Sequence, residues 1–373
     1  MGNKDIHVGI VGAGKIGTAI YSLLLGKNTG YKISIADIDS HHKHWQINQS
    51  HFFEIETPIS YDTQFNKYVK DITLIINALP FTQNINLYQA CLEYNVPYFD
   101  LSEDDGLDDW IEDRNYITPT RTGLPFTMPH CGLAPGMSTI IANHLTESFS
   151  DLHDVKIRVG ALSQDATNKL KYHASWSGDG LVNEYMGKCQ VVRNGSFDMV
   201  DALSGYETLV IDGIDYEAFH TSGGIGTFAE TLADRNIAGV NADYKTVRRV
   251  GHHQYVDFLF NDLKLPQDVL TDMFKKYIPT TRKDQVLLYA AAGGYTGNEI
   301  SYQTRTYDMM FKPSFIFGQT YTAIEYTTAC GILSMVELFL DGKLPKEGYV
   351  RQESVSWEDA SSTSFGRFYR EDY

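Results

Sequence analysis

The chain has 373 residues, of which 43% are hydrophobic and 21% are charged. This is an ordinary globular balance, and it excludes a wholly disordered or collagen-like chain. Lys and Arg number 31 against 47 Asp and Glu, a formal net charge of −16, which argues against nucleic-acid binding and against attachment to anionic membranes. One hydrophobic core rarely grows beyond about 250–300 residues, so we expect two domains.

The cysteines and the apolar runs indicate the compartment. Cys91, Cys131, Cys189 and Cys330 lie far apart and form no C-x-x-C pair, which argues against a zinc ribbon or a redox dithiol. Unpaired cysteines fit a reducing cytoplasm. The N-terminal apolar run is short and broken by glycine, and no later run reaches about 18 residues, so we expect neither a signal peptide nor a membrane span.

The first third of the chain alternates predicted strands with predicted helices. Ile6–Val11 is typical of a buried parallel strand, and a helix is predicted over 18–25. Further strands are predicted at 32–36, 71–78, 97–100 and 126–129, and further helices at 87–94 and 137–147. This alternation predicts a doubly wound parallel sheet.

Beyond about Val155 the pattern becomes β-rich. Strands are predicted at 156–162, 171–176, 285–292 and 300–309, and two hairpins at 190–197 and 209–219. Asn194-Gly195 in the first hairpin is a strong two-residue turn signal. A mostly antiparallel sheet is therefore expected. The apolar stretch 321–340 predicts one long helix, in which Glu325 and Glu337 argue against a membrane span.

The glycines after the first strand have the spacing of a dinucleotide-binding turn. Gly12, Gly14 and Gly17 form a G-x-G-x-x-G pattern between a predicted strand and a predicted helix, and Asp37 ends the next strand twenty positions after Gly17. These are the conditions of the dinucleotide fingerprint. The three glycines serve a tight turn, close approach of the pyrophosphate, and helix packing. A turn without a ligand is the alternative. The residues predicted to complete this turn are Ala13, Lys15 and Ile16.

The carboxylate of Asp37 favours NAD as the cofactor. It would accept hydrogen bonds from the ribose and repel a 2′-phosphate by roughly 4 kcal/mol at about 4 Å and an effective dielectric near 20. The cluster His41, His42, Lys43 and His44 could offset part of this repulsion, so NADP stays open. The nicotinamide half is expected to lie at the ends of the middle strands, against Ala78, Leu79, Pro80, Leu101 and Ser102.

Several segments, in this order, resemble the saccharopine dehydrogenase family, in the branch of saccharopine reductases and lysine 6-dehydrogenases. The resemblance covers nearly the whole chain, and its most specific segment is Cys131-Gly132-Leu133-Ala134-Pro135-Gly136-Met137, which resembles a G-L-x-P-G motif. The other segments are 12–17, Leu79-Pro80-Phe81, Tyr98-Phe99-Asp100-Leu101-Ser102, Tyr172-His173-Ala174-Ser175-Trp176-Ser177 and 244–252.

The resemblance implies an NAD(P)-dependent enzyme that transfers a hydride between nicotinamide and a carbon bearing nitrogen. It implies a Rossmann domain over 1–133 that is completed by 320–373, whose helix returns to it. It also implies a second α+β domain of mixed or antiparallel sheet over 134–319, which binds the substrate and forms a homodimer. The expected partners are a small amino-acid or amine substrate, with no nucleic acid and no membrane.

One segment departs from the family pattern. Fungal saccharopine reductases carry an N-R-D-S stretch in a region that helps to hold substrate carboxylates, whereas this chain has Phe219-His220-Thr221-Ser222-Gly223-Gly224. Saccharopine has three carboxylates and favours arginine partners. The departure therefore puts saccharopine in doubt and makes lysine, or another amine, an alternative. Thr221 is a candidate substrate-binding residue.

Amine oxidation by hydride transfer needs an unprotonated nitrogen, so the site needs a base or a dry pocket. His130, before the G-L-A-P-G turn, is a candidate base, with a turn-capping histidine as the alternative. Asp100, at the end of a strand, is the second catalytic candidate. Ser102, Glu103 and Asp104 follow it, and for the last two a solvated acidic loop is at least as plausible.

The remaining substrate-side candidates are Cys131 and four residues of the second domain. Cys131 is a candidate pocket residue, with a packed small hydrophobe as the alternative. Tyr172 and Trp176 would point to the same face of one predicted strand, so they either line a pocket or belong to the hydrophobic core. Arg248 and Arg249 are adjacent on a strand and must face opposite sides, so at most one reaches a substrate. His252 is interpreted as structural, and no metal is predicted.

These observations predict an NAD-preferring oxidoreductase of saccharopine dehydrogenase type acting on the C–N bond of an amino acid. A lysine 6-dehydrogenase-like enzyme and a carboxy-polyamine dehydrogenase are the alternatives of the same class. A non-catalytic dinucleotide-binding sensor is the alternative of a different class.

Overall fold

The computed structural model describes residues 6–38, 48, 51–55, 68–114, 123–176, 178–297 and 301–370. The chain divides into two compact units. Unit 1 comprises Met1–Met137, Phe315–Tyr321 and Glu325–Tyr373, and unit 2 comprises Ser138–Ser314 and Thr322–Ile324. The sequence-based domain limits stay a prediction, because compactness does not show which segment folds alone. His41 to His44, Ser177 and Ile300 lie outside the described residues.

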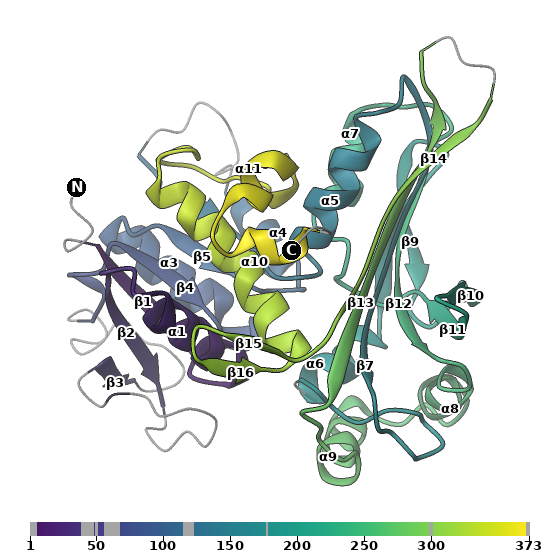
Figure 1. Ribbon diagram of the computed structural model, residues 1–373, viewed down its shortest axis with the longest axis horizontal. Coiled ribbons are helices and arrows are strands. Elements are labelled where there is room, and N and C mark those ends of the chain that lie inside the picture. Colours follow the sequence, from purple (N-terminus) through teal and green to yellow (C-terminus); the bar gives the residue numbers. More distant parts are fainter. Residues whose placement is uncertain are drawn as a thin grey trace. The chain divides into compact units, whose positions relative to one another are not determined.

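Unit 1 is built on a parallel six-stranded sheet in the order β3-β2-β1-β4-β5-β6 (Figure 1). All residues of β1 and β4 are buried, as expected for strands covered on both faces. The chain runs outward in one direction from β1 and in the other from β4, so their carboxyl ends form the topological switch point where such folds bind ligands. The strands are β1 (His7–Val11), β2 (Lys32–Asp37), β3 (Phe52–Glu54), β4 (Leu74–Asn77), β5 (Tyr98–Asp100) and β6 (Thr127–Met128).

The helices of unit 1 pack on this sheet through apolar faces. Leu87, Cys91 and Leu107 of two helices lie in one core cluster with Val11 and Ile75 of the sheet. The helices are α1 (Lys15–Lys27), α3 (Asn84–Tyr94), α4 (Gly106–Glu112), α10 (Ala323–Leu340, from Glu325 onward) and α11 (Trp357–Ser362), with short helices η3 (Phe81–Gln83), η5 (Gln352–Ser354) and η6 (Gly366–Tyr369). The long C-terminal helix thus belongs mainly to unit 1, as predicted.

Helix α10 is the one helix among the described residues that is long and apolar enough to cross a membrane by length and composition. Within it 78% of the residues are buried inside the protein.

Unit 2 is built on an eight-stranded mixed sheet whose main path is β10-β11-β12-β7-β13-β14, with β8 pairing β12 and β9 (Figure 1). Most neighbours are antiparallel, whereas β12 and β7 are parallel. The Asn194-Gly195 turn joins β8 to β9 as predicted, with φ of 50° and 81°. The strands are β7 (Asp151–Ser163), β8 (Lys188–Arg193), β9 (Ser196–Asp201), β10 (Glu207–Ile211), β11 (Ile214–Phe219), β12 (Asn241–Arg249), β13 (Asp284–Tyr295) and β14 (Gln303–Phe311).

Helices cover part of this sheet, and a small hairpin follows it. Tyr172, Tyr185, Phe219 and Phe274 belong to a core cluster shared by strand, loop and helix residues. The helices are α5 (Met137–Thr146, from Ser138 onward), α6 (Gly178–Glu184), α7 (Phe228–Asp234), α8 (His253–Asp257), the π-helical η4 (Phe258–Asp262) and α9 (Gln267–Tyr277). The hairpin is β15 (Ser314–Ile316) with β16 (Gln319–Tyr321), and from Phe315 onward it belongs to unit 1. The predicted fold class, a doubly wound parallel sheet with a second α+β unit, is confirmed.

The predicted strand over 171–176 is wrong. The segment is an irregular loop whose one ladder contact is a bridge between Ala174 and Thr280. The aromatic residues that suggested a strand instead pack into the core cluster of unit 2, with Tyr172 buried and Trp176 half-buried. The alternation of apolar residues in this segment therefore reflects how the loop packs against the core, and not pairing within a sheet.

Candidate active site

The glycine-rich turn between β1 and α1 has the shape that its spacing predicts. Gly12 has a φ of +105°, and an added Cβ would lie 2.6 Å from the carbonyl oxygen of Ala78. A Cβ on Gly17 would collide with the Gly12 carbonyl oxygen. By contrast, nothing lies within 4 Å of the position a Cβ would take on Gly14. The turn is thus tight at Gly12 and Gly17 and open at Gly14, as backbone approach by a pyrophosphate requires.

Asp37 lies against this turn. Its Oδ2 accepts a hydrogen bond of 2.5 Å from the Ala13 amide, and its Oδ1 accepts one of 2.7 Å from the Ile38 amide. Lys15 and Ile16 form the first turn of α1 and are half-buried. The predicted cofactor residues of β1, α1 and β2 therefore lie together at the carboxyl edge of the sheet.

The loop after β4 meets the same turn. The Ala78 amide donates to the Val11 carbonyl at 2.7 Å, and the Leu79 amide donates to Asn77 Oδ1 at 3.0 Å. Leu79 is half-buried and Pro80 is exposed. Ala78, Leu79 and Pro80 thus follow the central strand that adjoins β1, which is where a nicotinamide ring would lie in such a fold.

Asp100 is buried, and its hydrogen bonds link the ends of three strands. Asn77 Nδ2 donates to the Tyr98 hydroxyl at 2.8 Å, and that hydroxyl donates to Asp100 Oδ2 at 2.9 Å. Asp100 Oδ1 accepts from the Ser102 and His130 amides at 3.0 and 2.9 Å. Burial raises the pKa of Asp100, against the opposing field of His130. This carboxyl group holds β4, β5 and the turn after β6 together, and Leu101 and Ser102 follow it in the same loop.

His130 is buried with both ring nitrogens hydrogen-bonded to the protein. Its Nδ1 lies 2.7 Å from the Ser102 carbonyl oxygen and its Nε2 lies 2.6 Å from Asp108 Oδ2. A carbonyl oxygen only accepts, so Nδ1 carries a hydrogen. Burial alone would lower the pKa of His130, but the Asp108 carboxylate outweighs it and raises that pKa well above its usual value. In Asp108 burial raises the pKa and His130 outweighs it, so the pKa falls. The two groups form an imidazolium–carboxylate pair.

The C-terminal part of the chain supports this pair. Tyr349 follows α10 and forms a bridge with Thr127 of β6, and its hydroxyl donates to Asp108 Oδ1. His130 has a φ of +61°, in the left-handed region that histidine adopts more often than most residues. The ion pair therefore fixes an irregular turn. Next to it the Cys131 thiol is buried and donates to the Met128 carbonyl at 3.2 Å, and burial raises its pKa well above the usual value, so it is a neutral thiol.

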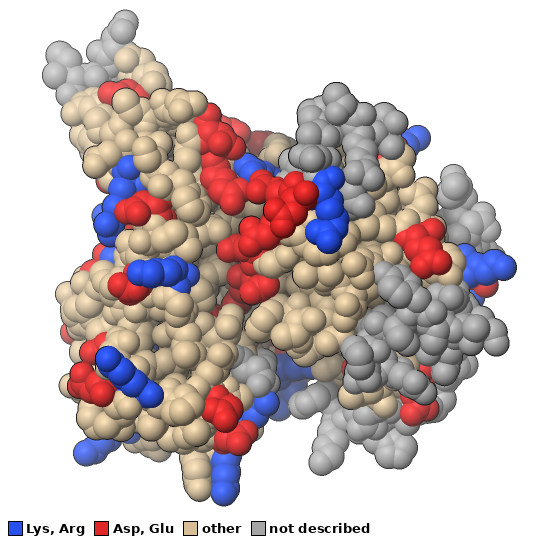
Figure 2. All heavy atoms as spheres, turned by 180° about the vertical axis from the view of Figure 1, so that it is seen from behind, with Lys and Arg blue, Asp and Glu red and all other residues tan. Residues whose placement is uncertain are grey.

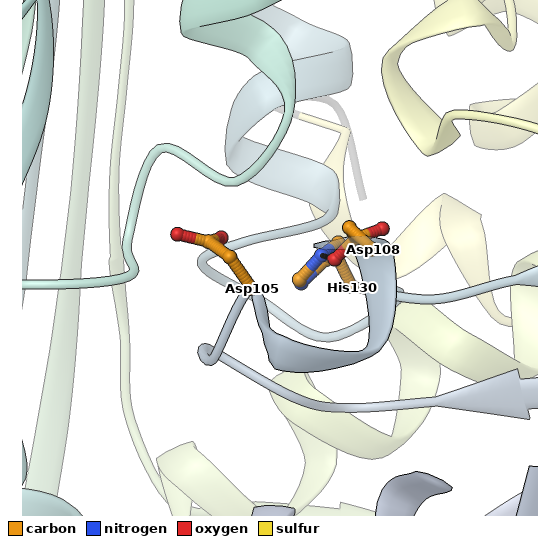
Figure 3. A group of neighbouring side chains, drawn as sticks. All are labelled: Asp105, Asp108 and His130. Atoms are coloured by element: carbon orange, nitrogen blue, oxygen red, sulfur yellow. Dashed lines mark hydrogen bonds and ion pairs between the residues drawn. The ribbon is translucent and has the colours of Figure 1, made fainter. Parts of the chain in front are cut away.

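Asp105, which the sequence analysis did not single out, lies beside the pair (Figure 3). It precedes α4 and is half-buried, and one of its oxygens lies within 4.8 Å of donor atoms of Asp108 and His130. Burial raises the pKa of Asp105 to about 6. The acidic run after β5 was a visible signal, but it did not distinguish Asp105 from Glu103 and Asp104.

Asp105, Asp108 and His130 also have donor types that can bind a metal ion. The Nε2 atom of His130 and Oδ2 of Asp108 are, however, already joined in the ion pair. A metal would have to displace that pair. The sequence-based expectation of no metal stays a prediction.

In unit 2 the candidates Tyr172 and Arg248 lie in one buried group. Arg248 Nε donates to the Tyr185 hydroxyl at 2.9 Å, and its Nη2 donates to Glu184 Oε2 at 3.3 Å. The guanidinium carbon lies 5.3 Å from the centre of the Tyr172 ring. Arg248 is only 2% exposed, so this arginine is held by Glu184 and Tyr185 within the core.

The other candidates of unit 2 lie apart from that group. Thr221 is buried and its hydroxyl bonds that of Thr246 at 2.8 Å. Arg249 is half-buried on the opposite face of β12 from Arg248, over the Tyr216 ring at 4.9 Å. It lines a hollow of about 420 Å³ with Lys171 and Asp215. His252 is buried, with Nδ1 2.7 Å from the Leu170 carbonyl oxygen and Nε2 3.0 Å from the Tyr185 hydroxyl.

Comparison with known proteins covers both units. A model described as the saccharopine dehydrogenase NADP binding domain matches residues 8–121, and one described as the saccharopine dehydrogenase C-terminal domain matches residues 132–367. The fold is similar to apo saccharopine dehydrogenase (L-Glu forming) from Saccharomyces cerevisiae, with 15% identity and a TM-score of 0.71 over 95% of each chain. It is also similar to DAP dehydrogenase from C. glutamicum in complex with DAP, with 12% identity, a TM-score of 0.50, and 99% of this chain and 100% of that chain covered. At these identities the two structures show a shared fold.

Proposed function

The chain belongs to the saccharopine dehydrogenase family, and from this membership we propose that it oxidises the carbon–nitrogen bond of an amino acid. Family membership makes it an NAD(P)-dependent oxidoreductase. The observation that carries the narrower proposal is the joint position of two features in one sheet. The open glycine turn follows β1, and the acidic group Asp100, Asp105 and Asp108 follows β5, both at the carboxyl edge.

The residues of unit 1 fit a nicotinamide dinucleotide. The open space above Gly14 and the first turn of α1 suit a pyrophosphate, and the Asp37 carboxylate suits a ribose diol. Such a carboxylate also repels a 2′-phosphate, so we propose NAD as the preferred cofactor. When bound, the nicotinamide ring supplies the hydride acceptor.

The acidic group suits a substrate that carries an ammonium group. A single imidazolium, His130, lies among Asp100, Asp105 and Asp108, so these four residues have an excess of negative charge. A cationic nitrogen would be attracted to this edge. Figure 2 shows larger acidic than basic patches on the face that it draws, in keeping with the net charge of −16.

The basic residues favour a substrate with fewer carboxylates than saccharopine. Arg248 is buried against Glu184, and the stretch from Phe219 to Gly224 has no arginine. We therefore propose lysine, or an amine of similar size, before saccharopine or a carboxylated polyamine. Of the substrate-side candidates in unit 2, Trp176 and Arg249 are part-exposed and remain proposals for direct contact.

The test is a turnover panel followed by the absorbance of the reduced nicotinamide. NAD and NADP are each combined with lysine, saccharopine, other diamino acids and polyamines. We expect reduced cofactor with NAD and a small diamino acid. Turnover of saccharopine alone would indicate that saccharopine is the substrate. Binding of the cofactor without turnover of any amine would instead favour a dinucleotide-binding sensor.

Two variants control this panel. Gly14→Val fills the open space above the turn and should abolish NAD binding, whereas Gly213→Asn, at an open turn of unit 2 whose positive φ asparagine tolerates, should leave NAD binding intact. Asp37→Ser should improve the use of NADP relative to NAD. Normal NAD binding by Gly14→Val would contradict the assigned cofactor site.

We also propose a cytoplasmic homodimer with small-molecule partners and no nucleic-acid ligand. All four cysteines are buried and free, which suits a reducing compartment. The dimer follows from the family resemblance, and light scattering of the purified protein tests it.

A further inference from the structure

The imidazole of His130 is closed to a substrate. Its Nδ1 hydrogen is directed to the Ser102 carbonyl, its Nε2 is bonded to Asp108, and the ring is completely buried. A proton acceptor needs a lone pair that the substrate can reach. The protonated and enclosed ring offers none, so a base at this edge has to be a group other than His130.

Asp105 is an acidic residue beside the pair that is only partly buried. It is half-buried, whereas Asp100 and Asp108 are buried. Figure 3 shows its carboxyl group to one side of the His130–Asp108 contact. The loop that carries it is ordered, because Ser102 Oγ accepts from the Asp104 amide and Asp104 Oδ1 accepts from the Gly106 amide, each at 3.0 Å.

We propose that Asp105 is the catalytic base and takes a proton from the ammonium group of the substrate. This inference rests on the proposed function. In the step an N–H bond of the ammonium breaks, its electron pair stays on nitrogen, and the proton forms an O–H bond on the Asp105 carboxylate. The resulting neutral amine has the lone pair that loss of a hydride from the neighbouring carbon requires.

The surroundings of Asp105 suit this role. Burial raises the pKa of Asp105 to about 6, the His130 imidazolium opposes the rise, and Asp108, Asp104 and Asp109 add to it. The carboxyl group is therefore ionised at pH 7 and is a stronger base than an ordinary aspartate. It accepts a proton more readily for that reason.

Asp108 and Tyr349 are positioning residues in this scheme, because they act on the site through His130. Asp108 keeps the imidazole charged, and the Tyr349 hydroxyl holds Asp108 in place. The charged imidazole in turn limits the rise in the pKa of Asp105. Loss of the His130 charge should move the pKa of Asp105 upward.

The first test is the pH profile of kcat/KM for Asp105→Asn with the amine selected by the panel. In the wild type kcat/KM should rise with pH through about 6, as Asp105 ionises. In the variant kcat/KM should fall about 100-fold or more, and this rise should vanish while NAD affinity stays unchanged. Asp105→Glu should recover part of the activity. The matched control is Asp113→Asn, an exposed acid at the other end of α4, which should stay within about threefold of the wild type.

A second measurement needs no turnover. With carbon-13-labelled aspartate, one carboxyl resonance should titrate near pH 6, disappear in Asp105→Asn, and shift when lysine is added. His130→Gln, which removes the imidazolium, should move its midpoint upward. Wild-type turnover combined with normal activity of Asp105→Asn, or with a resonance that lysine leaves unmoved, overturns the assignment of the base and leaves the proposed function standing. A wild type that oxidises no amine overturns the proposed function, and the base assignment falls with it.

Discussion

Two buried histidines, one from each unit, have the same contact at one ring nitrogen. His130 of unit 1 and His252 of unit 2 are both almost wholly buried, and each has Nδ1 2.7 Å from a main-chain carbonyl oxygen. The contact at the other ring nitrogen, Nε2, differs between the two histidines. Nε2 of His130 lies against the Asp108 carboxylate, whereas Nε2 of His252 lies against the Tyr185 hydroxyl.

The difference shows that the partner, rather than burial, decides the charge of a buried histidine. Burial lowers the pKa of both rings. Asp108 reverses this for His130, whose pKa is raised well above its usual value. Near His252 the Arg248 cation adds to the effect of burial, and the pKa falls to about 3. One ring is a fixed cation at the candidate active site, and the other is a neutral bridge in a core.

The largest effect that this comparison predicts is acid destabilisation through His252. Its pKa is about 3 in the folded protein against an ordinary 6.5, so the neutral ring stabilises the fold above pH 6.5. That stability is lost as the pH falls, by about 1.4 kcal/mol per pH unit, or about 5 kcal/mol over the whole window. His252→Gln offers one donor and one acceptor without a titrating group. Chemical unfolding at pH 7 and at about pH 4.5 should show a smaller loss for this variant, and equal losses would contradict the neutral ring.

Breaking the ion pair beside His252 should have the next largest effect. Arg248→Met leaves Glu184 buried without its cation and should cost about 3–5 kcal/mol in the free energy of unfolding. The double variant Arg248→Met with Glu184→Leu should recover most of this loss. Arg249→Met, which removes only a ring contact on the opposite face, should cost about 1 kcal/mol or less. Urea unfolding of the four proteins measures these values, and a double variant no more stable than the single one would contradict the account.

Breaking the pair at His130 should cost less, and its cost should depend on pH in the opposite sense. Asp108→Asn should lose about 2–3 kcal/mol at pH 6. The raised pKa of His130 means that this stability is present below pH 6.5 and is lost as the pH rises through the folded value. The lowered pKa of Asp108 means that it is also lost as the pH falls below about 3.8. Unfolding from pH 5 to 10 tests this, and a constant gap between the variant and the wild type would contradict a charged His130.

The smallest effect concerns the support from the C-terminal segment. Tyr349→Phe removes one donor to Asp108, which keeps its bond to His130, so the loss should be about 1 kcal/mol. The control is Tyr302→Phe, which removes the hydroxyl of an exposed tyrosine that donates to Asp154 in unit 2 and should cost less than about 0.5 kcal/mol. Unfolding at pH 7 compares the two, and equal losses would mean that Tyr349 adds nothing to the buried pair.

Features that depend on neighbours in the sequence could be predicted. The glycine turn, the strand that ends at Asp37 and the Asn194-Gly195 hairpin each follow from a few consecutive residues, because backbone geometry at a turn is local. The parallel order of unit 1 followed from alternation of strands and helices. The loop at 171–176 was predicted wrongly, because its aromatic residues alternate as in a strand but pack against helices.

The chemical state of the candidate site could not be predicted, because it depends on residues far apart in the chain. Asp108 lies 22 positions before His130, and Tyr349 lies 241 positions after Asp108. Neither spacing forms a motif. His130 was named from its place before the G-L-A-P-G turn, but only the fold shows that both of its nitrogens are bonded. Asp105 was indistinguishable from its acidic neighbours until the fold placed a carboxylate oxygen of Asp105 within 4.8 Å of donor atoms of Asp108 and His130.

The central claim is that a hydride leaves a carbon bearing nitrogen and reaches the nicotinamide. The most direct test is mass spectrometry of the reduced cofactor after turnover of the amine that the panel selects, deuterated at the carbon next to its reactive nitrogen. The account predicts that the reduced cofactor carries the deuterium. Reduced cofactor without deuterium, or bound cofactor that is never reduced by any amine, would contradict it.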